Sequence, residues 1–343
     1  MKLKPKLAMY WAASCGGCEV SLLNVGEKIL MVDRVFDIVF FPCIADFKYK
    51  DVEALSDDHI DLCLFNGAIR SSENQELAEL LRRKSRLLVA YGSCAHEGCI
   101  PALSNLTTAA DTLEAVFVSN FSTANPGGVV PRTTTRVPEG DLALPLLYDT
   151  VRALDQIVRV DYYIPGCPPE PPRIWEALEV FVDAFVGGAE LPAVGSVLGA
   201  TDLALCEECP LERNEKRVPR FFRPHEIVPD PKVCLLEQGI VCSGPATRGG
   251  CGALCPRAGM GCRGCYGLLQ GVVDQGAGMV AAVAAVLGVG SPQEEESAIE
   301  QTIERATSSI VDPAGTFYRH SLAHSLLRRR RPSITPNEAD EGS

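Results

Sequence analysis

The feature that most constrains this chain is a pair of cysteines, Cys15 and Cys18, at the turn between its first predicted strand and its first predicted helix. The apolar run at residues 7–13 is typical of a buried strand, and the apolar residues spaced along 20–30 predict a helix. In open parallel sheets, ligands bind outside the carboxyl ends of the strands. This Cys-x-x-Cys therefore predicts a site for a group that binds sulfur, although a redox dithiol or half of a zinc site has the same local sequence.

Short apolar runs alternate with helical patterns through the first half of the chain. Further strands are predicted at residues 36–41, 60–65, 86–91 and 158–164, and further helices at residues 73–84 and 174–186. This alternation predicts an α/β fold with a doubly wound parallel sheet. Residues 120–145 contain several prolines and glycines and predict a long loop, which is typical of a functional segment or an interface.

Four cysteines follow predicted strands directly: Cys15 and Cys18 after the first, Cys94 after the fourth and Cys167 after the fifth. They should converge at the carboxyl edge of one sheet. Four thiolates are a complete ligand set for one [4Fe–4S] cluster or one zinc ion, and their dispersal over three loops favours the cluster. The alternative, unrelated core cysteines, suits Cys63 but not these positions beside glycine and proline.

The second half of the chain is rich in cysteine and poor in helix or strand signal. Between residues 206 and 265 stand Cys206, Cys209, Cys234, Cys242, Cys251, Cys255, Cys262 and Cys265. Such a segment cannot build an apolar core and is expected to be held by its metals. Eight ligands serve two four-coordinate sites. Two zinc ions are the rival, and two cubane clusters are favoured because glycines and prolines crowd the ligands, as in ferredoxin-like segments.

Composition and charge indicate the cellular compartment of this protein and the classes of partner that it does not bind. The net charge of −12 argues against a general nucleic-acid binder, and the basic run at residues 328–331 is interpreted as a solvated end or a partner contact. Residues 1–6 lead into a strand without the apolar segment of a signal peptide, so we expect a cytoplasmic protein. Structural disulfides are rare in that compartment, so most of the 15 cysteines point to metal ligation. The small-residue segment at 271–288 is too polar and too short in its apolar part to span a membrane.

These patterns divide the chain into four parts. We expect a sheet domain with the first site at residues 1–190, a linker at 191–205, a two-cluster domain at 206–270, and a C-terminal helical arm with a disordered tail at 271–343. The arm includes an acidic helix start at residues 294–296 and is expected to wrap a neighbour, and the disorder is expected from residue 332.

Several motifs resemble the small, electron-transferring subunit of [NiFe] hydrogenases, and most closely the gamma (small) subunit of methyl-viologen-reducing hydrogenases. In the first half these are Cys15-Gly16-Gly17-Cys18, Gly92-Ser93-Cys94-Ala95 and Pro165-Gly166-Cys167-Pro168-Pro169. In the second half they are Cys206-Glu207-Glu208-Cys209-Pro210, Arg223-Pro224-His225-Glu226, Cys234-Leu235-Leu236-Glu237-Gln238-Gly239 and Gly244-Pro245-Ala246-Thr247-Arg248.

The resemblance implies a flavodoxin-like first domain and three [4Fe–4S] clusters that conduct electrons. It also implies a partner large subunit with the nickel–iron centre, and a chain that is not catalytic alone. A further acceptor subunit would be ferredoxin-like, of the heterodisulfide-reductase type or nicotinamide-linked. By motif, the ligands are Cys15, Cys18, Cys94 and Cys167 for the proximal cluster, Cys251, Cys255, Cys262 and Cys265 for the medial cluster, and Cys206, Cys209, Cys234 and Cys242 for the distal cluster.

The sequence departs from the family pattern in two places. Cys206 stands where many small subunits have a histidine, and Cys99 replaces a glycine that is usual in this branch. Because Gly17 occupies the other position at which some relatives have an extra cysteine, Cys99 is interpreted as a spare thiol near the proximal cluster.

The sequence also predicts roles for the remaining cysteines and for the histidines, and it leaves one competing function open. Cys43 and Cys63 are expected to be small core residues. The scattered histidines, His59, His96, His225, His320 and His324, are expected to be solvated or structural. The competing function is a zinc-stabilised interaction module with a single redox or cluster site.

Overall fold

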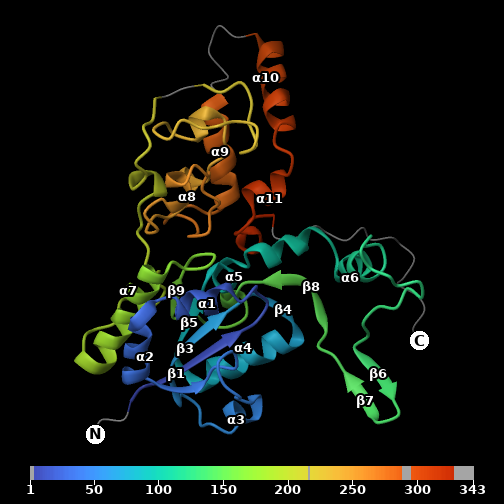
Figure 1. The fold of residues 1–343 in the computed structure, drawn as a ribbon, viewed down its shortest axis with the longest axis vertical. Helices are drawn as coiled ribbons and strands as arrows, with labels where there is room; N and C mark the ends of the chain where they lie inside the picture. The colour runs from blue at the N-terminus through green and yellow to red at the C-terminus, as the bar shows by residue number, and fades with distance from the viewer. Residues whose placement is uncertain (1–3, 215–216, 288–294, 328–343) are drawn as a thin grey trace.

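The computed structural model describes residues 4–214, 217–287 and 295–327. The basic run at 328–331, the expected disorder from residue 332 and the acidic residue 294 lie outside the described residues. Figure 1 shows a sheet domain at one end of the molecule and a cysteine-rich segment with helices α8 to α11 at the other.

A five-stranded parallel sheet forms the first domain. Its strands are β1 (Lys6–Trp11), β2 (Asp37–Phe40), β3 (Ile60–Asn66), β5 (Ser85–Tyr91) and β9 (Tyr162–Ile164). They lie in the order β2-β1-β3-β5-β9, which is the flavodoxin-like order and confirms the predicted fold class. The register pairs Trp11 with Asn66, Asn66 with Tyr91 and Tyr91 with Ile164, so the carboxyl ends of four strands meet at one edge.

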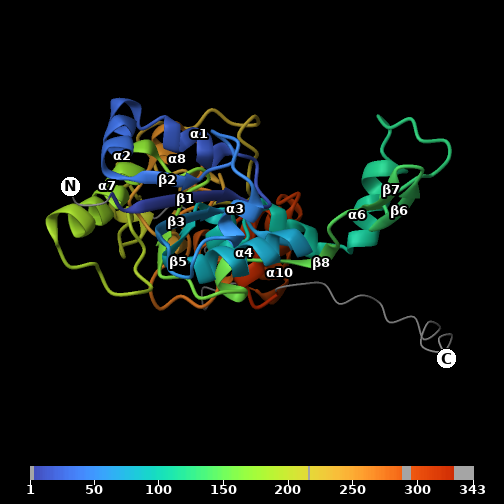
Figure 2. The same cartoon turned by 90° about the horizontal axis from the view of Figure 1, so that it is seen from below.

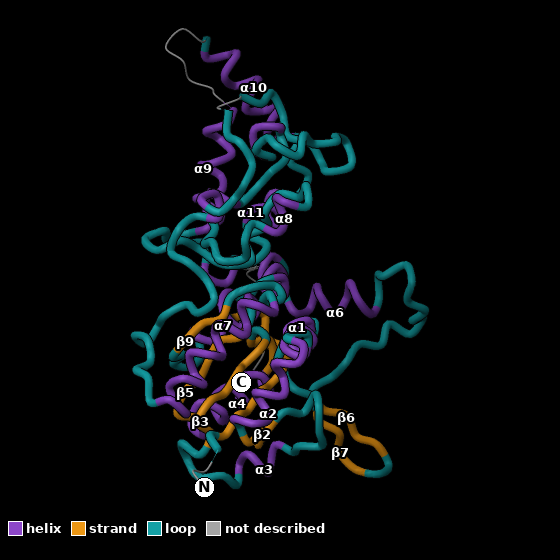
Figure 3. Tube along the Cα trace, turned by 60° about the vertical axis from the view of Figure 1, so that its left-hand side comes forward, coloured by secondary structure: helices purple, strands orange, loops and turns teal. Residues whose placement is uncertain are grey.

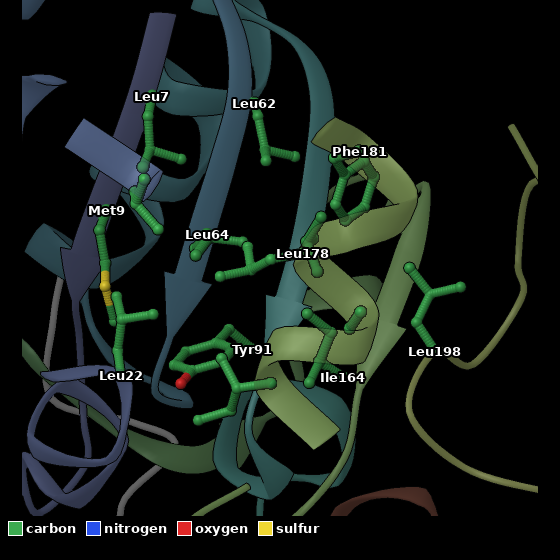
Figure 4. Packing of buried hydrophobic residues seen from close by; sticks show 14 of the residues in the cluster. Leu7, Met9, Leu22, Leu62, Leu64, Tyr91, Ile164, Leu178, Phe181 and Leu198 are labelled. Carbon is green, nitrogen blue, oxygen red and sulfur yellow. The ribbon is translucent and has the colours of Figure 1, made fainter. Parts of the chain in front are cut away.

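Helices cover both faces of the sheet because its strands alternate their side chains. On one face, Leu7, Leu62 and Leu64 pack against α1 (Gly17–Leu23), α2 (Ile29–Val35) and α7 (Pro171–Val182) (Figure 4). On the other face, Tyr10 and Phe65 pack against α3 (Tyr49–Glu53) and α4 (Ser72–Lys84). Helix α4 begins one residue before the predicted start, and the Ser71 hydroxyl caps it by accepting a hydrogen bond from the Asn74 N–H.

Two elements differ from the sequence prediction near the sheet. The helix expected at residues 20–30 is divided into α1 and α2, because Gly26 adopts a left-handed conformation (φ 70°) at the start of a 3₁₀ turn (Gly26–Lys28). The last strand is shorter than predicted, since the N–H of Val158 still bonds to the carbonyl of Leu154 in the 3₁₀ turn η3 (Leu154–Gln156).

The loop predicted at residues 120–145 contains two short strands, and the whole segment between β5 and β9 has several further elements. It contains α5 (Ser93–Glu97), the 3₁₀ helix η2 (Ile100–Leu106), α6 (Ala109–Phe117), and the strands β6 (Thr134–Val137), β7 (Gly140–Ala143) and β8 (Leu147–Arg152). Strand β8 pairs antiparallel with β4 (Ile69–Ser71), and β6 pairs with β7 as a hairpin. The hairpin and α6 project away from the sheet domain (Figures 2 and 3).

The second half is irregular, as predicted. Apart from short 3₁₀ turns it contains α8 (Leu254–Arg257), α9 (Gln275–Leu287), α10 (Glu296–Ser308), α11 (Pro313–Phe317) and the 3₁₀ turn η8 (Leu322–His324). A small apolar cluster joins the cysteine-rich loops to α9 and α10 through Leu205, Val283 and Ala306. None of the helices in the described ranges is both long and apolar enough to cross a membrane.

Two connecting segments pack on the sheet domain. Residues 191–205 run beside the edge strand, where the N–H of Tyr163 bonds to the carbonyl of Ser196 at 3.1 Å. The C-terminal arm returns to the same domain, where Gln156 Nε2 donates to the carbonyl of Ala323 at 2.9 Å. The described part of the arm thus contacts this chain's own first domain. The division of the chain into these four parts remains a prediction.

Substituting Phe181 by alanine tests the packing of α7 on the sheet. Phe181 is fully buried and its ring lies 5.6 Å from that of Tyr162, so Phe181→Ala should lower the free energy of unfolding by about 3–5 kcal/mol. Phe121→Ala is the matched control, because Phe121 is fully exposed. Urea unfolding followed by circular dichroism measures both. Equal midpoints for the two variants would contradict this account of the core.

Candidate metal centres

The first group of cysteines lies where three strands end. Cys15 and Cys18 flank the start of α1 after β1, Cys94 lies in α5 after β5, and Cys167 follows β9. Burial, and then the neighbouring thiols of Cys94, Cys167 and Cys15, raise the pKa of Cys18. A cavity of about 480 Å³ is lined by Cys15, Cys94, Cys167 and Cys99. The structure thus brings together the four thiols predicted from the three loops.

Gly92 allows the loops to approach one another. Its φ is +83°, and a Cβ atom built there would lie 2.5 Å from Sγ of Cys18. A side chain at residue 92 would therefore displace the Cys18 sulfur. The Gly-Ser-Cys sequence has its glycine because the chain must pass this close to a thiol.

A fifth thiol and a histidine complete this end of the sheet. Sγ of Cys99 lies 3.7 Å from Sγ of Cys167 and 3.0 Å from Nδ1 of His320. The hydrogen bond from Cys99, and then the nearby His320 side chain, lower the pKa of the Cys167 thiol, which favours the thiolate that a metal binds. Cys99 is therefore a thiol beside the predicted proximal ligands, as the sequence indicated.

Of the two roles expected for His320, solvated or structural, its position in the fold agrees with the structural one. It is only 5% exposed and lies against a predicted site, although 221 residues separate it from Cys99 in the sequence. No local motif marks it. Cys43 is a correction, because it is exposed whereas Cys63 is buried in the core as expected. Cys43 comes after β2 and stands in a surface turn.

The group predicted as distal lines a single cavity. Cys206, Cys209, Cys234 and Cys242 all border a space of about 310 Å³ together with Leu205 and Pro245. Burial, followed by the thiols of Cys242, Cys234 and Cys209, raises the pKa of Cys206 to about 12. The four sulfur atoms therefore surround one common space.

The group predicted as medial lies between the other two. Burial raises the pKa of Cys265 to about 12, with contributions from the nearby thiols of Cys167, Cys251 and Cys255. Burial and then Cys242 raise the pKa of Cys262, and Cys265 adds to that effect. The medial cysteines thus lie near each other, with Cys265 facing the proximal group and Cys262 facing the distal group.

Hydrogen bonds hold these loops in place. Glu208, within the Cys206–Cys209 motif, accepts hydrogen bonds from the N–H groups of Gly250 and Gly252 at 3.0 Å and of Ala253 at 3.3 Å. This carboxylate thereby connects the first distal motif to the loop around Cys251. Such charge-assisted bonds are stronger than neutral ones and position loops that have no helix or strand of their own.

The spacing of the thiols bears on what they can bind. The ligand atoms of Cys99, Cys167 and His320 all lie within 4.8 Å of one another. Across the described ranges, no other set of three or more His, Cys, Asp and Glu ligand atoms meets this limit. In a tetrahedral zinc site, the sulfur atoms would stand only about 3.8 Å apart, given Zn–S bonds of ~2.3 Å. Among the described residues, no three cysteines of any one predicted group meet that 4.8 Å limit.

Buried ionisable side chains lie between the proximal and medial loops. Glu97 and His96 are both within about 3 Å of the space that a side chain on Gly267 would occupy. Burial raises the pKa of Glu97 from its ordinary 4.5 to about 7 and lowers that of His96 to about 4. The His96 ring packs at a tilt of 42° against that of Tyr163, whose hydroxyl donates to Asp155 at 3.1 Å. Both buried groups are therefore neutral near pH 6.

A comparison with known protein families finds a match to the first half of the chain. Residues 15–181, which include the proximal group, match the family "NADH ubiquinone oxidoreductase, 20 Kd subunit". The matched residues include most of the parallel sheet and the loops that carry Cys15, Cys18, Cys94 and Cys167.

Relatives along almost the whole chain make the assignment specific. The iron-sulfur subunit of the F420-non-reducing hydrogenase of Archaeoglobus profundus is 34% identical over 95% of this chain and 98% of its own length. The corresponding F420-non-reducing hydrogenase subunit of Methanothermobacter marburgensis is 35% identical over 95% of this chain and 97% of its own. The delta subunit of the NAD-reducing hydrogenase HoxS of Cupriavidus necator is 29% identical over 52% and 79%. The chain belongs to the hydrogenase small subunits, in the family of these F420-non-reducing hydrogenase subunits, which confirms the resemblance.

Replacing Glu97 by glutamine tests the buried carboxyl group. The pKa of Glu97 is raised in the folded state, so its stabilising contribution is complete below about pH 4.5 and is lost as the pH rises through about 7. Glu97→Gln should remove this dependence and raise the free energy of unfolding at pH 8 by up to ~3 kcal/mol, with little change at pH 4.5. Urea unfolding across that range measures it. The exposed Glu76→Gln is the control, and parallel pH profiles for wild type and Glu97→Gln would refute the assignment.

Proposed function

We propose that this chain is the electron-transfer small subunit of a cytoplasmic [NiFe] hydrogenase. It would conduct electrons between the nickel–iron centre of a partner large subunit and an external acceptor through three [4Fe–4S] clusters. The proximal, medial and distal ligand sets are the three cysteine groups described above. The chain would not be catalytic alone, and its domains would be residues 1–190, 206–270 and 271–343, with 191–205 between the first two. The printed name of one relative, an iron-sulfur subunit, supports the cofactor.

The observation that carries the proposal is that the three cysteine groups are contiguous. The N–H of Gly166 donates to the carbonyl of Cys265 at 3.1 Å, and the Ser93 hydroxyl donates to the same carbonyl at 2.5 Å, which joins the proximal loops to the medial group. The N–H of Cys262 donates to Sγ of Cys242 at 3.3 Å, which joins the medial group to the distal group. Such a series suits electron transfer across the whole chain.

The residues present fit iron–sulfur clusters. Every proposed ligand is a cysteine without a disulfide partner, and cysteine thiolates are the ligands that hold [4Fe–4S] clusters. When bound, the clusters would supply one-electron transfer. The residues of the chain would hold them by their thiolates, donate backbone hydrogen bonds to the sulfur atoms and exclude water by burial, all of which set reduction potentials.

The exposed end of the proximal group offers a surface for the large subunit. Cys15 is exposed and is flanked by Trp11, 44% exposed beside Gly16, and by Ile100, 51% exposed on the same cavity. Large apolar side chains beside an exposed thiol are typical of a surface that a partner covers. The distal group, at the other end of the series, would face the acceptor subunit, which is ferredoxin-like, of the heterodisulfide-reductase type or nicotinamide-linked.

A cytoplasmic location is part of the same proposal. All 15 cysteines are free of disulfides in the structure. A chain with this many free thiols suits a reducing compartment, where they remain available to bind metal.

Metal analysis of the purified complex is the first test. Three cubane clusters require about twelve iron atoms and twelve sulfide ions per chain with negligible zinc, in addition to the one iron of the nickel–iron centre in the partner. We expect these values after anaerobic purification with the bound partner. A value of about four iron atoms with two zinc ions would instead indicate the zinc-stabilised module and limit electron transfer to the first domain.

Cysteine variants test the ligand sets one at a time. Cys206→Ser should lower the iron content from about twelve to about eight, as expected for one lost cubane, and should slow hydrogen-driven dye reduction. The proximal signal in electron paramagnetic resonance (EPR) should persist, because Cys206 and the proximal cysteines belong to different cavities. Cys43→Ser, at an exposed cysteine outside all three groups, is the matched control and should retain all the iron. Loss of the proximal signal in Cys206→Ser would contradict the division into separate sites.

A further inference from the structure

Cys99 holds a backbone conformation that cysteine rarely adopts. Its φ is +47° and its ψ is −147°, and it is fully buried. A non-glycine residue in this region costs of order 1–3 kcal/mol, which is tolerated where the surrounding structure requires that side chain. Glycine would remove the strain. The cysteine is therefore expected to have a role for which its thiol is needed.

The surroundings of the thiol indicate that role. Sγ of Cys99 stands between Nδ1 of His320, at 3.0 Å, and Sγ of Cys167, at 3.7 Å. A thiol can accept one hydrogen bond on sulfur while it donates its own hydrogen. With Nδ1 of His320 protonated, the ring donates to Cys99 and the Cys99 S–H donates to the sulfur of Cys167.

The C-terminal arm holds His320 in this position. The N–H of Cys99 donates to the carbonyl of His320 at 3.1 Å, so the two residues are joined through both backbone and side chain. Downstream, His324 Nε2 lies 2.9 Å from Oδ1 of Asp155. The last described part of the chain is thus anchored beside a sulfur atom of the first domain.

We propose that His320 and Cys99 form a hydrogen-bond relay to Cys167 that positions its sulfur and raises the reduction potential of the proximal cluster. The inference rests on the proposed function, since it assumes that Cys167 is a cluster ligand. Reduction adds negative charge to a cluster and its sulfur ligands. A hydrogen bond to a ligand sulfur stabilises the reduced state more than the oxidised state, and therefore raises the potential. Cys99 is a positioning residue here and not a ligand.

The test is an EPR-monitored redox titration of the purified complex. Cys99→Ala and His320→Ala should each shift the proximal midpoint potential to a lower value with the iron content unchanged. The double variant should shift it little further than Cys99→Ala alone, because both residues act through one hydrogen bond to Cys167. Cys99→Ser and His320→Gln, which keep a donor, should recover part of the shift. His225→Ala, at an exposed histidine, is the control and should match wild type.

The outcomes separate the relay from the proposed function. Unchanged potentials in Cys99→Ala and His320→Ala, with a normal proximal signal, would overturn the relay and leave the proposed function in place. A loss of about four iron atoms in Cys99→Ala would show that Cys99 is a ligand, which also overturns the relay. A wild-type complex without any proximal signal would overturn the proposed function and the relay with it.

Discussion

The contact between Cys265 and the loops of the sheet domain holds the two halves of this protein together. The carbonyl of Cys265 accepts hydrogen bonds from the N–H of Gly166 and the hydroxyl of Ser93, which lie next to Cys167 and Cys94. Backbone groups that are buried at such a junction must be paired, because an unpaired carbonyl costs about 1–3 kcal/mol. The two cysteine groups are therefore fixed next to each other by the same bonds that join the two domains.

The cysteine-rich half has little apolar core of its own, and its order has other sources. One is the small cluster that joins Leu205 and Val283 to Ala306, and another is the Glu208 carboxylate that holds the loop around Cys251. The remaining source is the group that the thiols would bind. Burial raises the pKa of several of these thiols, and metal binding would stabilise their thiolate forms. Folding of this half is thus expected to depend on its cofactors, whereas the sheet domain has an extensive core.

The C-terminal arm has a structural role that its position at the end of the chain does not suggest. It leaves the cysteine-rich half after α10, passes α11 and returns to the sheet domain (Figure 1). There it buries His320 and Ala323 and pairs His324 with Asp155. The arm therefore contacts the sheet domain at the same end as the proximal cysteines, so both the first and the last described parts of the chain form that site.

The sequence by itself determined the parallel sheet, the position of its thiols and the irregular second half. Strand and helix periodicity are local properties, and a cysteine that follows a strand must lie at the edge where parallel strands end. Only the tertiary structure revealed that His320 meets Cys99, that Cys43 is exposed and that a hairpin forms at Thr134–Ala143. A contact between residues far apart in the sequence depends on how all intervening elements pack. No local pattern records it, so the partner of Cys99 could be found only in the folded chain.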